Sequence, residues 1–498
     1  MSLLTNAGLL LSLIAVTTLT AGEPAPPQIE THYIGYRGNG TGVFPNDCVP
    51  VTTWKQYDLK TGKDEKGKPI QVADKDKPNP VNIAWKTQLP KSLIYGNNAG
   101  VIVAGGKVFA LIEPPEQGGM MAPVLCCLDP QDGTILWQTV CHHVDSLPEG
   151  IRAETLKDLA AYNDFYREWN RCGERYLGLA RQLSTSYHYG PKPRTPEEKA
   201  VVEADLAKAA DELKALGIMK PGTVAGGKAI KQPEKGDPPY DLIQRLVKVG
   251  YSNMIDPWIG NTACAIGRAC TTPCSDGERV YVVTPFQDLF CIDLNGKILW
   301  QQYWGDGKMV GDRANYYPSP ILVDGMVIRY RHLGDAKTDI LSVRAFDKFS
   351  GKLLYSVPGP KTGGAYFLGV PQILTVDGVR LLSLSDGRII RASNGEVLLE
   401  ETIGYSAHGR SDLGLGNWLW TINGQDGGGY SGDKNRNMKN GEMIAHRFSW
   451  SDAGKTKLVH EIPWRTMENN GSVFGYYQGG IYHQTDRTTF GIHDAWTG

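Results

Sequence analysis

The chain has 498 residues, with 52 basic and 53 acidic side chains and a formal net charge of −1. This length exceeds what one small core holds, so we expect several domains or a closed array of repeats. The balanced charge gives no broad electrostatic attraction to nucleic acid or anionic lipid, and we predict neither as a partner. Outside one region the sequence is rich in Gly, Val, Tyr, Trp and Asp-Gly pairs, which favours short strands joined by tight turns.

Residues 1–22 are typical of an export signal. The apolar run from Leu9 to Leu19 is followed by small residues, and we expect cleavage near Ala21. No Lys or Arg precedes this run, and Leu19 fits a small-residue cleavage pattern poorly, which are departures from the usual signal. No later stretch is apolar over enough residues to cross a bilayer. We therefore predict a secreted, periplasmic or cell-envelope protein, with residues 23–80 as an N-terminal extension.

The nine cysteines are an odd number, so at least one has no partner within the chain. Their spacing matches no zinc pattern and no Cys-x-x-Cys-His haem motif, and we predict no metal site. The adjacent pair His142 and His143 lacks a third ligand close by. In an oxidising compartment two of Cys264, Cys270 and Cys274 could form a disulfide, and buried thiols beside strands are the alternative.

A turn motif that ends in an aromatic residue recurs along the chain. Residues 127–137 (CLDPQDGTILW) recur as 291–300 (CIDLNGKILW) and 345–355 (AFDKFSGKLLY), with weaker copies at 391–399, 452–455 and 492–498. From the second copy onward the turn glycines recur about every 50 residues, near the roughly 40–50 residues of a propeller blade. The motif residues are Asp129, Gly133, Trp137, Asp293, Gly296, Trp300, Asp347, Gly351, Tyr355, Asp494 and Gly498.

Each copy follows a strand, a Gly-containing turn and a second strand, as in 101–109 (VIVAGGKVF) and 321–328 (ILVDGMVI). Gly-Gly and Asp-Gly provide the positive φ values that two-residue hairpins require. Each unit thus predicts four antiparallel strands, which is a propeller blade. The terminal ring should cover the turn of the neighbouring blade, and the Asp should accept hydrogen bonds from turn amides. We predict an all-β propeller of five complete blades and a partial sixth.

The pattern Asp-x-x-Thr/Ser/Asp-Gly-x-x-x-Trp, with a small residue two positions before the Asp, resembles the tryptophan-docking motif of pyrroloquinoline quinone (PQQ) repeats. Residues 36–45 (YRGNGTGVFP) and 82–87 (NIAWKT) resemble the opening of secreted bacterial PQQ-binding-like repeat proteins. The family also includes quinoprotein alcohol dehydrogenases and the propeller subunit of the outer-membrane protein assembly machinery. The likeness covers most of 33–498 outside one insertion, and it implies a fold more strongly than a cofactor.

That insertion, residues 145–250, has a helical period. Apolar residues recur at three- and four-residue steps through 159–183, which predicts an amphipathic helix. A second helix is expected with Thr195 as N-cap, Pro196 first, Glu198 completing a capping box and Gly217 at its end. We predict a helical hairpin that packs on itself or on the propeller rim. Its aromatic stripe is expected in the core, with partner binding as the alternative; the stripe consists of Tyr162, Tyr166, Trp169 and Tyr176.

The two ends of the chain leave ring closure open. Residues 82–89 predict a lone outer strand and residues 471–498 predict three strands without one, so the two could complete a sixth blade. A turn at Thr497 and Gly498 serves a following strand, however, and favours truncation of a seven- or eight-bladed parent. The closing strand and first blade would occupy 81–144, and the remaining blades 251–498.

Two functions follow from the family. We expect a binding or scaffold module that holds a protein or small-molecule ligand at one propeller face, with the helical hairpin as a further contact. The resemblance implies as alternative a quinoprotein dehydrogenase with PQQ and calcium on the axis, in which Cys126 and Cys127 would lie against the quinone. Strand alternation directs these two side chains to opposite faces. The calcium ligands and a base-plus-Arg pair have no matching positions, so we assign neither cofactor nor catalytic residues.

Polar residues just before the inner strands are the candidate ligand-binding positions, because these loops reach the mouth of the central channel. Arg313, His408 and Arg410 could together form a small anion site at the axis. The whole set is Asn97, Asn98, Arg313, Asn315, His408, Arg410, Asn469 and Asn470.

Overall fold

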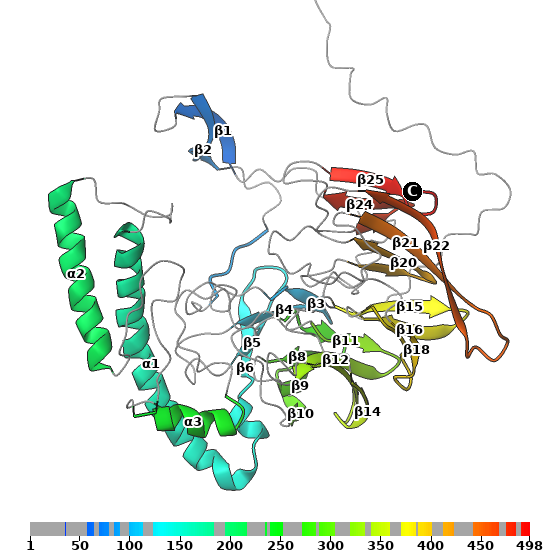
Figure 1. Ribbon diagram of the computed structural model, residues 1–498, viewed down its shortest axis with the longest axis horizontal. Coiled ribbons are helices and arrows are strands. Elements are labelled where there is room, and N and C mark those ends of the chain that lie inside the picture. Colours follow the sequence, from blue (N-terminus) through cyan, green and yellow to red (C-terminus); the bar gives the residue numbers. More distant parts are fainter. Residues whose placement is uncertain are drawn as a thin grey trace, which may run out of the picture.

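Small antiparallel sheets dominate the computed structural model (Figure 1). Five sheets have four strands, one has three, and within each the strands pair in chain order. We call these six sheets blades 1 to 6. The structure describes residues 35, 57–63, 69–78, 84–89, 99–112, 123–183, 195–216, 235–236, 240–251, 271–284, 288–303, 319–333, 340–358, 370–384, 387–400, 412–422, 442–467, 475–484 and 490–498.

The strands of the six blades are numbered in chain order. Blade 1 contains β3 (Ile102–Ala104), β4 (Lys107–Ile112), β5 (Val124–Leu128) and β6 (Ile135–Val140). Blade 2 contains β7 (Cys274–Ser275), β8 (Arg279–Val283), β9 (Asp288–Asp293) and β10 (Ile298–Tyr303), and blade 3 contains β11 (Ile321–Val323), β12 (Met326–Leu333), β13 (Ile340–Asp347) and β14 (Leu353–Val357). Blade 4 contains β15 (Gln372–Val376), β16 (Val379–Ser383), β17 (Ile389–Arg391) and β18 (Val397–Leu399). Blade 5 contains β19 (Leu413–Leu415), β20 (Trp418–Ile422), β21 (Glu442–Trp450) and β22 (Leu458–Met467), and blade 6 contains β23 (Gly475–Tyr477), β24 (Gly480–Gln484) and β25 (Phe490–Asp494).

The propeller fold predicted from the repeat is confirmed, with five complete blades and a three-stranded sixth. The inner hairpins have the predicted geometry, since Asp324 and Gly325 have φ values of 46° and 81°, and Asp377 and Gly378 have 48° and 79°. Two consecutive positive φ values define the turn whose twist matches that of the flanking strands. A separate hairpin, β1 (Tyr57–Lys63) with β2 (Pro69–Pro78), precedes the blades.

Aromatic rings on the outer strands join consecutive blades, which follow one another around an arc (Figure 1). The Trp137 indole donates to the Leu294 carbonyl of blade 2 at 3.2 Å and covers the turn there. A Cβ atom on Gly296, whose φ is 90°, would lie 2.9 Å from that ring, so only glycine fits. The other docked rings donate from Trp300 to Lys348, Tyr355 to Ala392 and Trp464 to Ala495.

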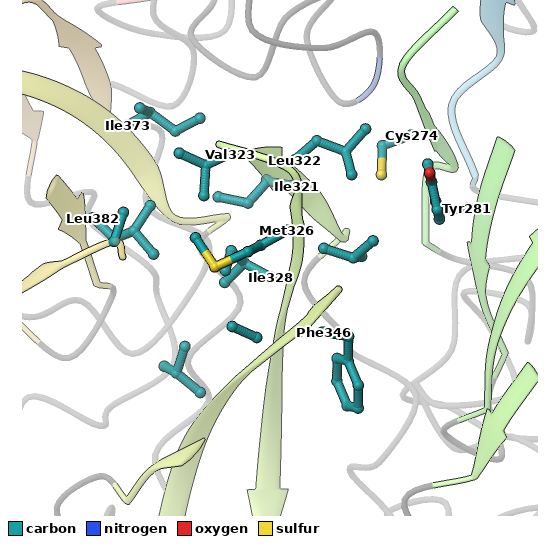
Figure 2. Packing of buried hydrophobic residues seen from close by; sticks show 14 of the residues in the cluster. Cys274, Tyr281, Ile321, Leu322, Val323, Met326, Ile328, Phe346, Ile373 and Leu382 are labelled. Atoms are coloured by element: carbon teal, nitrogen blue, oxygen red, sulfur yellow. The ribbon is translucent and has the colours of Figure 1, made fainter. Parts of the chain in front are cut away.

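The largest hydrophobic cluster spans blades 2, 3 and 4. Figure 2 shows Ile321, Met326 and Ile328 of blade 3 between Tyr281 of blade 2 and Leu382 of blade 4. Each blade is too thin to bury both of its faces alone, and stacking makes the core continuous.

The insertion forms η1 (His143–Ser146), α1 (Glu149–Leu183), α2 (Pro196–Ala215) and α3 (Tyr240–Lys248). The Thr195 hydroxyl accepts from the Glu198 amide at 3.2 Å and the Glu198 carboxylate accepts from the Thr195 amide at 3.3 Å, which completes the predicted capping box. Two points differ from the sequence prediction. α1 begins ten residues before the apolar stripe, and α3 lies where we expected a linker. The C-cap of α2 is Leu216, directly before the predicted Gly217, which lies outside the described residues.

Candidate functional site

We call α1, α2 and α3 the helical arm. With 35 residues, α1 is about 50 Å long, and α1 and α2 extend away from the blades (Figure 1). The arm has its own hydrophobic core. The buried members of the stripe, Tyr162 and Tyr176, are 1% and 5% exposed, in agreement with the expected core role. The side chains of Tyr166 and Trp169 lie outside the described residues.

Ion pairs tie the three helices of the arm together. Arg175 of α1 lies 3.1 Å from the Glu212 carboxylate of α2. Arg245 of α3 donates from two nitrogens to both oxygens of Asp158 in α1, each at 2.8 Å. The hydrogen bonds from Arg245 lower the pKa of Asp158 below its ordinary value. A two-bonded Arg–carboxylate pair fixes orientation as well as distance, so α3 is held across the base of α1.

The arm is anchored to blade 2 by a buried histidine. The Nδ1 atom of His143 lies 2.9 Å from Oδ2 of Asp288, the first residue of β9, and both side chains are fully buried. The Nε2 atom of His143 lies 2.8 Å from the Val249 carbonyl, just after α3. The Thr284 hydroxyl donates to Asp288 at 3.0 Å. The His143 imidazole therefore joins three parts of the protein. They are the segment that follows β6 of blade 1, the residue that follows α3, and β9 of blade 2.

This arrangement favours the charged form of His143. A carboxylate and a carbonyl are both acceptors, and the positively charged imidazole has a hydrogen on each ring nitrogen to donate to them. Burial lowers the pKa of His143, but the Asp288 carboxylate and the hydrogen bonds from Asp288 and Val249 outweigh it and leave the pKa raised. The carbonyl end of α3 also favours a cation there. The anchor is a buried ion pair.

Two tyrosines and a glycine enclose the anchor. The rings of Tyr251 and Tyr303 meet the His143 imidazole edge-on, with centroids at 4.8 Å and 4.5 Å. Gly250 has a φ of 100°, and a Cβ atom there would overlap the Tyr303 hydroxyl and lie 2.8 Å from His143 Nε2. Only glycine allows the chain after α3 to approach the imidazole so closely.

The neighbouring His142 has a different role. Its Nδ1 atom accepts from the Val144 amide at 3.2 Å and caps η1, and burial lowers its pKa. Because both nitrogens of His143 are also occupied, the two histidines are not placed to share a metal ion. Within the described ranges, no three His, Cys, Asp or Glu side chains gather in a metal-binding group.

The His143–Asp288 pair is placed to hold the helical arm on blade 2 and not to transfer a proton. A catalytic imidazole needs one ring nitrogen facing a substrate, whereas Nε2 of His143 faces a backbone carbonyl inside the protein. Sequence reasoning considered His143 only as a metal ligand and did not single out Asp288. The two residues are 145 positions apart, and no local signal pairs them.

The cysteine pair does not fit the quinone-contact arrangement. Cys126 packs on the face of β5 toward Trp85, while Cys127 packs on the face toward blade 2. Both are free thiols and fully buried. The predicted opposite orientation is confirmed, and a bond between them would break β5. Among the described residues, this adjacent cysteine pair thus does not fit a contact with PQQ. Cys274 is also a free, buried thiol, while Cys264 and Cys270 lie outside the described residues.

All the candidate ligand-binding positions before the inner strands lie outside the described residues. They are Asn97, Asn98, Arg313, Asn315, His408, Arg410, Asn469 and Asn470. Their described neighbours connect the blades. The Gly100 amide donates to the Thr272 hydroxyl, and the Thr272 amide donates to the Ser319 hydroxyl, each at 2.9 Å. Starts of inner strands in blades 1, 2 and 3 are therefore joined by hydrogen bonds.

Residues 258–418, which contain the second to fourth motif copies, match a PQQ-repeat family model described as outer membrane protein assembly factor BamB. Residues 258–418 therefore contain PQQ-like repeats. The resemblance drawn from the turn motif is thus confirmed over this segment. No curated protein matches. No helix among the described residues is both long and apolar enough to cross a membrane.

Among solved structures, the chain is similar to BamB from Moraxella catarrhalis, with 11% identity, a TM-score of 0.28 and coverage of 82% of this chain and 85% of that one. It is also similar to the quinohemoprotein alcohol dehydrogenase ADHIIG from Pseudomonas putida HK5, with 10% identity, a TM-score of 0.30 and coverage of 83% and 67%. A third similar structure is a europium-containing methanol dehydrogenase, with 9% identity, a TM-score of 0.30 and coverage of 82% of this chain and 78% of that one.

Proposed function

We propose that this protein is an exported scaffold of the cell envelope that holds a protein partner on the helical arm. The observation that carries this proposal is the buried ion pair of His143 and Asp288, which fixes the base of a long projecting element to the propeller. His143 precedes α1 and contacts Val249 after α3, so the arm is held to blade 2 where it starts and where it ends. A rigid arm loses less conformational entropy when it binds a partner. The assembly-factor description of the matching family model supports the same role.

The surface of the arm suits a polar protein contact. Its apolar stripe is used inside, where α1 packs on α2 and α3. The exposed surface of α2 carries both acidic and basic residues, among them Lys199 and Glu203. Val201 is 63% exposed and lies one helical turn from Glu197 and from Asp205. An exposed apolar residue beside charged ones is common in interfaces that form and dissociate.

Site-specific photo-crosslinking tests the proposal. A photoreactive amino acid replaces Val201 on the arm or Leu136 on β6, which is 46% exposed and serves as the matched control. In intact cell envelopes we expect one defined protein adduct from position 201 and none from position 136. Equal labelling from both positions, or no adduct from position 201 in a folded protein, would contradict the proposed role of the arm.

Two further measurements separate the alternatives. Purified protein is titrated with PQQ and calcium while quinone absorbance and dye-linked alcohol oxidation are recorded. Stoichiometric binding with turnover would replace the scaffold proposal by the dehydrogenase function. Export is tested by N-terminal sequencing of the protein from the envelope fraction, where we expect a mature start close to residue 22. An intact Met1 in a cytoplasmic fraction would contradict export.

A further inference from the structure

Two histidines in blade 5 are bonded directly to each other. Nδ1 of His446 on β21 lies 2.8 Å from Nε2 of His460 on β22, and the two rings are stacked. The other nitrogen of His446, Nε2, lies 3.0 Å from the Thr421 hydroxyl on β20. His446 is 1% exposed, while His460 is partly buried and stacks on Phe448. A chain of side-chain hydrogen bonds therefore crosses three strands of the blade.

The bond between the two rings can hold only one hydrogen. One ring nitrogen donates and the other accepts, so at least one of the two imidazoles is neutral. If both rings were protonated, Nδ1 of His446 and Nε2 of His460 would each carry a hydrogen and could not bond. Two positive charges would then lie on rings whose centroids are 5.0 Å apart. Water screens a buried pair of charges poorly, so the contact is incompatible with a second proton.

The groups of blade 5 that face the pair offset a second charge only in part. The Thr421 hydroxyl on β20 is uncharged. On β22 the Glu461 carboxylate favours the charged form of His460, but Glu461 is itself paired with Arg447 of β21. Burial lowers the pKa of His460 below its ordinary value, and Glu461 opposes this effect without reversing it.

Blade 4 faces the pair with apolar side chains. Phe448, which stacks on His460, belongs to a hydrophobic cluster with residues of blade 4 such as Leu381. The charged residue of blade 4 beside this cluster is Arg391, which is paired with Glu396. A cation at this position cannot compensate a further positive charge. Within the described part of blade 4, these residues provide no carboxylate for a doubly protonated pair.

The pair lies at an irregularity in the pairing of β21 with β22. The register shifts between Ala445 and Arg447, where β22 has one residue more than β21. Pro463 lies in this bulge and has no amide hydrogen to donate to the ladder. His446 is the residue of β21 at the shift. The side-chain bond from His446 to His460 therefore joins the two strands where their backbone pairing is interrupted.

We propose that the His446–His460 pair is a pH-sensitive switch, which holds β22 on β21 near neutral pH and releases β22 in mild acid, when both imidazoles take up a proton. β22 is the outermost strand of blade 5, and Trp464 on β22 donates to the Ala495 carbonyl of blade 6. Release of β22 therefore loosens the contact between these two blades. The switch is independent of the helical arm, which is anchored to blade 2.

The direction of the pH effect follows from proton uptake. After β22 has separated, both histidines protonate near the ordinary pKa of about 6.5, whereas the closed pair resists the second proton. Closed blade 5 is therefore fully stable above that pH, and its closing equilibrium falls by up to about tenfold per pH unit below it. The His143 anchor has the opposite pH dependence, so a melting temperature mixes the two effects. A local measurement is required.

Amide hydrogen exchange of the whole protein, followed by mass spectrometry of its peptides, measures the opening of β22. The exchange rates are corrected for their intrinsic dependence on pH. We expect the protection of residues 458–467 to fall by about tenfold between about pH 7 and about pH 5. Residues 321–328 of blade 3, which contain no histidine, should change by less than about twofold.

The variant His460→Gln keeps a hydrogen-bonding side chain but cannot take up a proton. Its loss of protection in mild acid at residues 458–467 should shrink to less than about twofold. The matched control is His493→Gln on β25, because the His493 ring lies 6.2 Å from the ring of Trp464 on β22. This control should lose protection as the unmodified protein does.

Three results would overturn the switch. They are unchanged protection of residues 458–467 in the unmodified protein at about pH 5, an undiminished loss in His460→Gln, and an equal loss at residues 321–328. The last result would mean that acid unfolds the blades together and not β22 alone.

Discussion

The guanidinium of Arg391 lies 5.3 Å from the ring centroid of Trp450 and joins blade 4 to blade 5. The outer strand of blade 4 ends in Leu399, so no aromatic ring extends from it to the next turn. Instead Trp450 of β21 reaches back and donates to the Val376 carbonyl of blade 4 at 3.1 Å. Arg391 in turn donates to the Lys455 carbonyl in the turn of blade 5 at 2.7 Å. The ring that stacks at this interface therefore comes from the following blade.

We expect Arg391→Met to lower the free energy of unfolding by about 1–2 kcal/mol, because it removes a partly buried cation–π contact and a hydrogen bond across two blades. Arg447 lies 5.6 Å from the Trp418 ring but is 45% exposed and paired with Glu461, so Arg447→Met is the control. It should cost less than about 1 kcal/mol. Urea unfolding followed by tryptophan fluorescence measures both, and equal losses would contradict the assigned role of Arg391.

The His143–Asp288 pair predicts a pH-dependent stability. The pKa of His143 is raised in the folded protein, so its contribution is fully present below the ordinary histidine pKa and is lost as pH rises through the folded pKa. His143→Gln should therefore cost most at about pH 5.5, on the order of 3–5 kcal/mol because it leaves Asp288 buried without its partner charge. The difference in melting temperature from the unmodified protein should narrow toward about pH 9. A difference that stays constant or widens as pH rises would contradict a raised pKa of His143 in the folded protein.

A comparison of Gly250 with Gly236 distinguishes the cost of a positive φ from the cost of steric overlap. Their φ values are 100° and 105°, but a Cβ atom on Gly236 meets no atom within 4 Å, whereas one on Gly250 overlaps Tyr303 and approaches His143. We expect Gly236→Ala to cost about 1–2 kcal/mol, and Gly250→Ala to cost clearly more because it also displaces the anchor. Thermal unfolding of the two variants provides the comparison. Similar losses of stability in the two variants would mean that the overlap at Gly250 costs nothing beyond its positive φ.

Cys126 and Cys127 should be unreactive in the folded protein. Burial raises the pKa of the Cys126 thiol to about 11 and raises that of Cys127 as well, and the thiolate is the reactive form. With iodoacetamide at about pH 8 we expect no labelling of either residue until denaturant is added. Mass spectrometry of the two labelled samples reports both sites. Rapid native labelling, or a disulfide between the two, would contradict the position of this pair inside β5.

Short-range patterns were sufficient for the blades and the arm. Asp-Gly at 324–325 indicated its hairpin because only few residues adopt two positive φ values in succession. Thr195 and Glu198 marked the start of α2 because a capping box closes within one helical turn. Alternation along β5 placed Cys126 and Cys127 on opposite faces for the same local reason. α3 was missed because nine residues give too few turns for a periodic pattern to stand out.

By itself, the sequence determined the repeated four-stranded unit and the ring on the outer strands of blades 1, 2 and 3, since each depends on residues a few positions apart. Tertiary structure alone decided which distant groups meet: His143 with Asp288, Arg391 with Trp450, and Trp85 with the turn at Pro130. Such contacts depend on how blades stack and on where the arm folds back. The energies that select them, burial of charge and of apolar faces, arise only when segments far apart in the chain exclude water together.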